Sequence, residues 1–395
     1  MSKQHNLNFI LAVIVTAQFC CTSLWFAGNG VMTDLVANFG LPESALGHLT
    51  SAVQFGFITG TLIFALLTIA DRFSPSYVFL GCALLGALFN LGTIWEQNTL
   101  TSHLTLRFMT GFCLAGIYPV GMKIASDYFQ KGLGKSLGFL VGALVVGTAF
   151  PHLLKGLTEA LPWKAVLQIT SGLAVLGGVL IAVFVPNGPY RKASQKINLS
   201  ASFKVFKNPD FRGAAFGYFG HMWELYAFWA FVPVILQTYV SLHEGVQINV
   251  PIWSFIIIGI GGISCVIGGY LSESMGTKRV AFRSLLMSGI CCLLSPLVFM
   301  LGIKALFLTF LIFWGMVVIA DSPLFSTLVA QNAPVEYKGT ALTIVTCIGF
   351  AVTIFSIQLL NYLTGMWQPI YLYLVLAAGP VFGLIMLNTQ RKTIL

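Results

Sequence analysis

The chain has 395 residues, of which 57% are hydrophobic and only 8% are charged. Soluble globular proteins carry about 25% charged residues, so this composition excludes a soluble domain and predicts a protein that crosses the membrane many times. The net charge of +9 does not indicate nucleic-acid binding, because the basic residues lie in short loops and form no basic stripe or motif.

Twelve apolar segments follow one another along the chain, each long enough for a membrane-spanning helix of about 20 residues. They lie at residues 9–30, 45–69, 75–95, 101–127, 134–157, 163–185, 211–237, 249–272, 280–301, 305–330, 339–362 and 368–388. Their continuous apolar character excludes the period-two alternation of a β-barrel. The first segment is too long for a signal-peptide core, so we expect it to remain as a span.

The longest polar stretch, residues 187–210, separates the first six segments from the last six. We therefore predict an N-terminal six-helix bundle at 1–186, a basic linker at 187–210 and a C-terminal six-helix bundle at 211–395. Loops on the side opposite the linker hold only three basic residues, Lys155, Lys164 and Lys304. The positive-inside rule then predicts a cytoplasmic linker and cytoplasmic termini, in a plasma or bacterial inner membrane.

The turns after the second and eighth segments share an acid and basic residues. The first turn contains Asp71 and Arg72, and the second contains Gly269, Glu273, Gly276, Lys278 and Arg279. Asp71 and Glu273 are 202 positions apart, about half the chain, which indicates an internal duplication.

This organisation resembles the major facilitator superfamily of membrane transporters, whose loop motif is Gly-x-x-x-Asp-Arg-x-Gly followed by two basic residues. The second turn is similar to that motif, with Glu273 as the acid and the basic pair displaced by one position, whereas the first turn lacks both glycines. The resemblance implies an all-α membrane protein of twelve transmembrane helices in two pseudo-symmetric six-helix bundles. It also implies that both turns stabilise one state of alternating access.

Arg107 and Gly111 in the fourth segment match the superfamily's Arg-x-x-x-Gly pattern. Gly134, Gly138 and Gly142 in the fifth recur every four residues, which predicts close approach of a neighbouring helix backbone. The fifth segment lacks the Gly-Pro dipeptide of the antiporter motif, so export receives little support. The chain looks loosely like bacterial permeases for small organic and inorganic anions.

Four ionisable residues lie inside predicted spans: Arg107, Lys123, Glu224 and Asp321. None has a charged counterpart at an offset of 202, so a symmetric scaffold does not require them, and intramembrane charges usually serve function. Glu224 lies nearest the middle of its span. Snorkelling to the membrane surface is the structural alternative for Lys123 and Arg107, and a satisfied packing role is the alternative for both acids.

His221 and Glu224 are three residues apart and share a helix face, so we expect the imidazole to help hold the carboxylate. A hydrogen-bonded packing histidine is the alternative. Gln18, Trp25 and Asn29 form one stripe of the first span. The resemblance implies that the first, fourth, seventh and tenth helices line the transport cavity, and these four carry the unusual polar residues Asn29, Arg107, Tyr118, His221, Glu224 and Asp321.

These features favour a secondary active transporter that moves a small organic anion with protons. In this hypothesis Arg107 and Lys123 attract the anion, while Glu224, His221 and Asp321 handle the proton. The residues expected to shape the binding cavity are Trp25, Asn29, Tyr118 and Trp229. Proton-driven efflux of amphipathic or cationic compounds is an alternative, as is a membrane receptor or scaffold that does not transport. The direction of transport, and whether sodium replaces the proton, stay open.

Neither an enzyme nor a cofactor-dependent protein is indicated. The sequence has no H-E-x-x-H, G-x-S-x-G or P-loop motif, so an ion gradient is the expected energy source. The eight cysteines lie in apolar segments without CxxC spacing, which argues against a zinc site or a disulfide framework. We expect a monomer without cofactor or metal, whose partners are the substrate, the proton and the lipid bilayer.

Overall fold

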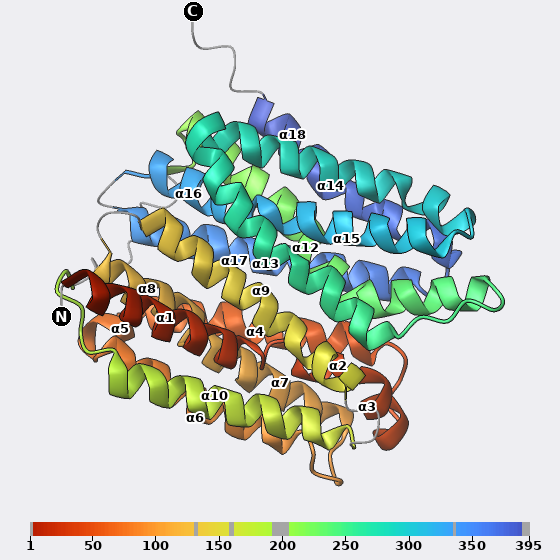
Figure 1. The fold of residues 1–395 in the computed structure, drawn as a ribbon, viewed down its shortest axis with the longest axis horizontal. Coiled ribbons are helices and arrows are strands. Elements are labelled where there is room, and N and C mark those ends of the chain that lie inside the picture. The colour runs from red at the N-terminus through yellow and green to blue at the C-terminus, as the bar shows by residue number, and fades with distance from the viewer. Residues whose placement is uncertain (1–2, 130–132, 158–161, 192–204, 335–336, 389–395) are drawn as a thin grey trace, which may run out of the picture. The chain divides into compact units, whose positions relative to one another are not determined.

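The structure is a computed structural model that describes residues 3–129, 133–157, 162–191, 205–334 and 337–388 (Figure 1). Over these residues the chain is helical and contains no strand. Eleven of the described helices are long and apolar enough to cross a membrane, and Leu7–Thr22 is a shorter apolar helix. The predicted all-α, multi-pass membrane architecture is therefore confirmed.

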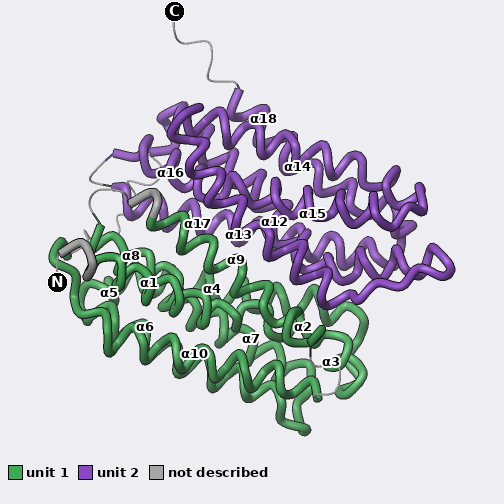
Figure 2. The backbone as a smooth tube through the Cα atoms, in the orientation of Figure 1, with its two compact units in different colours: residues 1–196 green, residues 197–395 purple. Residues whose placement is uncertain are grey.

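The chain forms two compact units, residues 1–196 and 197–395 (Figure 2). Most of the predicted linker, together with its Lys192, Lys196 and Lys204, lies outside the described residues.

The first unit contains ten helices within its described residues. They are α1 (Lys3–Thr22), α2 (Ala27–Gly30), α3 (Met32–Phe39), α4 (Ala45–Leu66), α5 (Ile69–Arg72), α6 (Pro75–Gly92), α7 (Leu100–Ala115), α8 (Tyr118–Tyr128), α9 (Leu133–Leu157) and α10 (Lys164–Phe184). Two predicted spans are broken: the first at residues 23–26, between α1 and α2, and the fourth at residues 116–117, between α7 and α8. Each break interrupts the helical hydrogen-bond ladder and leaves backbone groups that need other partners.

The second unit is built on a long first helix, which runs without a break through 34 residues. Its elements are α12 (Pro209–Leu242), α13 (Val250–Met275), α14 (Thr277–Met300), α15 (Lys304–Ala320), α16 (Ser322–Asn332), α17 (Lys338–Leu363), the 3₁₀ helix η2 (Pro369–Ala377) and α18 (Ala378–Asn388). Its fourth span is broken at Asp321, between α15 and α16.

The fourth span of each unit follows one pattern. In both the α7/α8 pair and the α15/α16 pair, the helix after the break has a proline at its second position: Pro119 in α8 and Pro323 in α16. Proline suits this position because its missing N–H would have no partner in the first turn of a helix. The two prolines are 204 positions apart, and so are the starts of α7 and α15.

Two glycine contacts repeat with the same spacing. A Cβ atom at Gly111 would collide with the Val53 carbonyl of α4, and one at Gly315 would collide with the Ile257 carbonyl of α13. The duplication is therefore in register at 204 in this region, not at 202. The loop acids gave a different offset because their turns differ: Asp71 lies in the separate helix α5, whereas α13 continues past Glu273.

The corrected register still leaves the intramembrane charges unmatched. Arg107 corresponds to Leu311, Lys123 to Thr327 and Asp321 to Ile117. The expectation of close backbone approach along α9 is wrong at Gly138, where an added Cβ would have no described atom within 4 Å. On α9 close approach occurs instead at Gly147, where an added Cβ would lie 2.6 Å from the Phe19 carbonyl oxygen of α1, and it also occurs between α4 and α7 and between α13 and α15.

Candidate functional site

Glu224 lies buried in α12, with 1% of its surface exposed, and accepts hydrogen bonds from two neighbouring helices. Trp314 Nε1 on α15 donates to Oε1 over 2.6 Å, and Cys292 Sγ on α14 donates to the same oxygen over 3.3 Å. Ser288 Oγ, one turn before Cys292, donates to Oε2. Both carboxylate oxygens therefore have partners, and all three donors are electrically neutral.

The charge of Glu224 has no opposite charge beside it. In the described part of the chain, no Lys, Arg or His nitrogen lies within ion-pair distance of this carboxylate. Neutral donors stabilise a buried carboxylate, but less than a cation would, because burial away from water opposes the charged form. A proton can therefore neutralise this group without breaking an ion pair.

His221 contacts Asp321, not Glu224. Its Nδ1 lies 2.8 Å from Asp321 Oδ1, and both side chains are 1% exposed. The expectation that His221 holds Glu224 is corrected by this contact. Residues three apart on a helix share a broad face but differ by about 60° in direction. His221 is thus directed to Asp321, at the break between α15 and α16. Glu224 is directed to Ser288 and Cys292 of α14 and to Trp314 of α15.

The His221–Asp321 pair keeps unused hydrogen-bonding capacity. His221 Nε2 and Asp321 Oδ2 have no hydrogen-bond partner among the described residues. Asp321 is both the C-cap of α15 and the N-cap of α16, so the opposite dipole ends of the two helices oppose each other at this residue. The pair therefore has two buried atoms that are available for a further hydrogen bond.

Arg107 on α7 is buried and holds the break in the first span. Its Nη1 donates to the Leu24 carbonyl over 3.1 Å, and its Nη2 donates to the Trp25 carbonyl. These carbonyls lie between α1 and α2, where the helical ladder is interrupted. A guanidinium suits this place because its planar fork can serve two acceptors at once. Sequence reasoning missed this structural contact, because it assigned Arg107 only to an anion or to the membrane surface.

Arg107 has no acidic partner in the described part of the chain. The ion pairs found there involve Lys123, Lys155, Lys164 and His221 as the basic partners. Two carbonyls use only part of its capacity of five N–H donors. The guanidinium therefore remains a buried positive charge that lacks a negative counterpart.

Two polar residues predicted to line a cavity also anchor the broken first span. Trp25 Nε1 donates to Gln54 Oε1 over 3.3 Å, and Asn29 Nδ2 donates to Thr50 Oγ1 over 2.8 Å. Both acceptors lie on α4, and all four side chains are buried. The α1/α2 region is thus held by hydrogen bonds with side chains of α4 and with Arg107 of α7.

Lys123 on α8 pairs with the loop acid Asp71, with 2.7 Å between Nζ and Oδ1. Arg191 Nη2 also donates to the backbone carbonyls of Asp71 and Phe73, each over 2.9 Å. The structure therefore joins two residues that the sequence had placed in different roles. Lys123 ties α8 to α5, and an ion pair of this kind does not require a substrate.

The remaining predicted residues have the following environments. Trp229 is fully buried in α12 and packs edge-on against Tyr226, with ring centroids 5.3 Å apart. Tyr118 is the first residue of α8 and is half-buried. Arg72 ends α5 and is exposed.

The second loop motif is arranged around a glycine turn. Gly269 and Glu273 lie on α13, and Lys278 and Arg279 lie in the first turn of α14. Gly276 joins the two helices with φ +89°, a conformation that other residues rarely adopt. The two turns therefore share their acid and basic residues but not their backbone structure.

Three partners of Glu224 were missed in the sequence: Ser288, Cys292 and Trp314. Ser288 and Cys292 are four residues apart, so they lie on one face of a predicted helix. This spacing was an available signal, but it does not say which neighbouring helix the face meets.

Comparisons with known proteins agree with this architecture. The profile of the Major Facilitator Superfamily matches residues 14–357. In the curated relative YfhI, an uncharacterized MFS-type transporter of Bacillus subtilis, 25% of residues are identical over 212 positions, which cover 52% of this chain and 51% of YfhI. The chain thus spans about half the length of that relative.

Two solved structures share the fold. The MFS proton:xylose symporter XylE, bound to 6-bromo-6-deoxy-D-glucose, has a TM-score of 0.75 at 13% identity and covers 97% of this chain and 95% of its own. A bacterial homologue of the human lysosomal transporter Spinster, inward-facing and unoccupied, has a TM-score of 0.71 at 14% identity and covers 98% and 96%. The chain belongs to the major facilitator superfamily of membrane transporters.

Proposed function

We propose that this transporter moves a small organic anion together with protons by alternating access, and that Glu224 is the coupling acid. The observation that carries this proposal is the burial of Glu224 among neutral donors only. A carboxylate kept as a fixed structural charge would gain most from a cationic partner. A carboxylate that must gain and lose a proton is better served by neutral partners.

Ser288 supports both protonation states of Glu224. A hydroxyl group can donate a hydrogen bond to a carboxylate, and after rotation it can accept one from a carboxylic acid. Trp314 can only donate, so it holds Oε1 in place while the proton is exchanged at Oε2. The proton therefore binds at Glu224 Oε2, the oxygen beside Ser288.

Asp321 is the second proton-handling group in this proposal. Its contact with His221 lets one proton be shared between the two side chains, so the pair holds that proton inside the protein. When one proton is shared by two side chains, the net charge of the pair changes less readily than the charge of a single acid. Asp321 is therefore placed second to Glu224 as the site of coupling.

The anionic character of the substrate is inferred from Arg107. This guanidinium is 2% exposed, and no carboxylate neutralises it in the described part of the chain. A buried cation without a counter-charge is unfavourable, and an incoming carboxylate would supply that charge. Its unused N–H donors match the geometry of a carboxylate.

A thermal-shift screen of the purified protein tests the substrate class. The anionic probes are lactate, succinate, citrate and benzoate, and the cationic probes are choline and tetraphenylphosphonium. A ligand at 100 times its dissociation constant stabilises the native state by about 2.7 kcal/mol. We expect at least one carboxylate to raise the melting temperature. Stabilisation by cations alone would contradict the proposal and favour an exporter of cationic compounds.

A further inference from the structure

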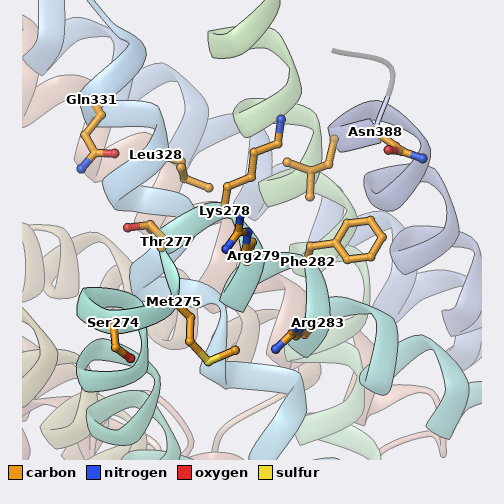
Figure 3. A pocket seen from close by; sticks show the side chains of 12 residues that line it. Ser274, Met275, Thr277, Lys278, Arg279, Phe282, Arg283, Leu328, Gln331 and Asn388 are labelled. Carbon is orange, nitrogen blue, oxygen red and sulfur yellow. The ribbon is translucent and has the colours of Figure 1, made fainter. Parts of the chain in front are cut away.

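The second unit contains a basic cavity that the transport proposal does not use. It has a volume of about 1000 Å³ and is lined by the end of α13, the start of α14, and residues of α16 and α18. Figure 3 shows Lys278, Arg279 and Arg283 of α14 between Leu328 and Gln331 of α16 on one side and Asn388 of α18 on the other. No Asp or Glu is among the described residues that line it.

The positive charge of this cavity favours the binding of an anion. Arg279 and Arg283 are four residues apart on α14, where like charges destabilise a helix. Neither has an acidic partner within ion-pair distance in the described part of the chain. A negatively charged group in the cavity would relieve this repulsion and could bind both planar guanidinium groups.

Two residues that line the cavity, Arg283 and Asn388, each lie at the end of an exposed apolar stripe. Arg283 begins an exposed stripe on α14 that continues, at alternating spacings of four and three residues, through Met287, Ile290, Leu294 and Leu297. Asn388 ends a similar exposed stripe on α18, which contains Phe382 and Ile385. The α14 stripe from Arg283 to Leu297 is about 21 Å long, more than half of a hydrocarbon core of about 30 Å.

We propose that this cavity binds the phosphate headgroup of an anionic phospholipid, whose acyl chains lie along the α14 and α18 stripes. The basic residues of the cavity would bind the phosphate group, and the apolar stripes would contact the acyl chains. A free phosphate ion would use the basic residues only. Basic pockets among membrane helices recognise lipid headgroups by this chemistry. The site is independent of the proposed coupling acid and substrate.

Lipid binding to the delipidated, full-length protein in detergent tests this inference. The probes are dioleoyl phosphatidylglycerol, dioleoyl phosphatidylcholine with the same chains, and soluble glycerol phosphate, with native mass spectrometry and thermal shift as readouts. We compare the parent with Arg279→Gln/Arg283→Gln and with the control Arg212→Gln/Lys338→Gln. The control removes two exposed basic residues that do not line the cavity.

We expect phosphatidylglycerol to bind the parent and the control alike, and to bind the cavity variant about tenfold or more weakly. Equal binding to the cavity variant and the control would overturn the proposal, as would equally tight binding of phosphatidylcholine. Glycerol phosphate that binds as tightly as the lipid would identify a soluble anion instead. If the double variant cannot be purified, Arg283→Gln alone should weaken phosphatidylglycerol binding about threefold or more, and unchanged binding would overturn the site.

Discussion

Trp314 Nε1 lies 2.6 Å from Glu224 Oε1, and this contact joins α15 to the buried carboxylate of α12. The position of Trp314 is fixed by its neighbour in sequence, because Gly315 allows α15 to approach the Ile257 carbonyl of α13. The close packing of α15 on α13 therefore positions the Trp314 donor beside Glu224 of α12. This relationship makes the environment of Glu224 sensitive to changes in α15.

The first prediction tests the Trp314–Glu224 contact by a double-mutant cycle. Trp314→Phe removes the donor, and we expect a loss of about 1–3 kcal/mol in the free energy of unfolding because a buried acceptor is left with fewer partners. In a Glu224→Leu background, which lacks the acceptor, the same change should cost clearly less. Trp95→Phe, at an exposed position, is the control. Equal losses in both backgrounds would show that the contact contributes no coupling energy.

A second prediction concerns the buried pair of His221 and Asp321. Removing either partner from a buried ion pair costs about 3–5 kcal/mol, so His221→Ala and Asp321→Asn should each destabilise the protein by up to this amount. The double variant should be less destabilised than the sum of the two. In transport assays His221→Ala should resemble Asp321→Asn and not Glu224→Gln. Additive stability losses would contradict the pairing.

Arg107→Lys is the third change. Lysine keeps the charge but loses the planar fork, so it cannot serve the Leu24 and Trp25 carbonyls and a substrate carboxylate together. We expect the stabilising carboxylate to bind about tenfold more weakly, as measured by calorimetric titration. The exposed change Arg72→Lys is the control. Unchanged affinity in Arg107→Lys would leave Arg107 as a support of the helix break only.

The fourth prediction uses the repeated glycines. Gly111→Ala and Gly315→Ala should each destabilise the protein by about 1–3 kcal/mol, because the new methyl group would collide with a backbone carbonyl. Gly138→Ala has open space at the same atom, so we expect it to be neutral or to stabilise by up to about 1 kcal/mol. Thermal unfolding in detergent compares the three. Equal effects at all three positions would contradict the close helix contacts.

Hydrophobic length and turn chemistry were enough to predict most of the fold. The apolar segments predicted the spanning helices. The spans at 101–127 and 305–330 were predicted without a break, although Pro119 and Pro323 are signals at which a helix readily begins. The break in the first span was not predictable, because the residues at 23–26 include neither Gly nor Pro. It is held by contacts from Arg107 and α4, which are far away in the sequence.

The buried charged residues of the candidate site were predicted from the sequence, but their pairing and the neutral donors around Glu224 were not. An acid in the middle of an apolar segment identified Glu224, since such a charge is rare without a reason. Its partners depend on how α12, α14 and α15 are rotated about their axes, which residue spacing alone does not determine. A difference of about 60° was enough to direct His221 to Asp321 and Glu224 to Trp314.

Proton-driven accumulation by Glu224→Gln tests the central claim most directly. Glutamine keeps the size and an acceptor oxygen but cannot carry the proton. The parent, Glu224→Gln and the exposed control Glu96→Gln are reconstituted in proteoliposomes with the carboxylate that stabilises the protein most, and accumulation under a pH gradient is compared with exchange of labelled for unlabelled substrate. We expect Glu224→Gln to lose accumulation and keep exchange, with the parent and the control retaining both. Accumulation by Glu224→Gln in response to the gradient would contradict the account, and Asp321 would then be the better candidate for the coupling acid.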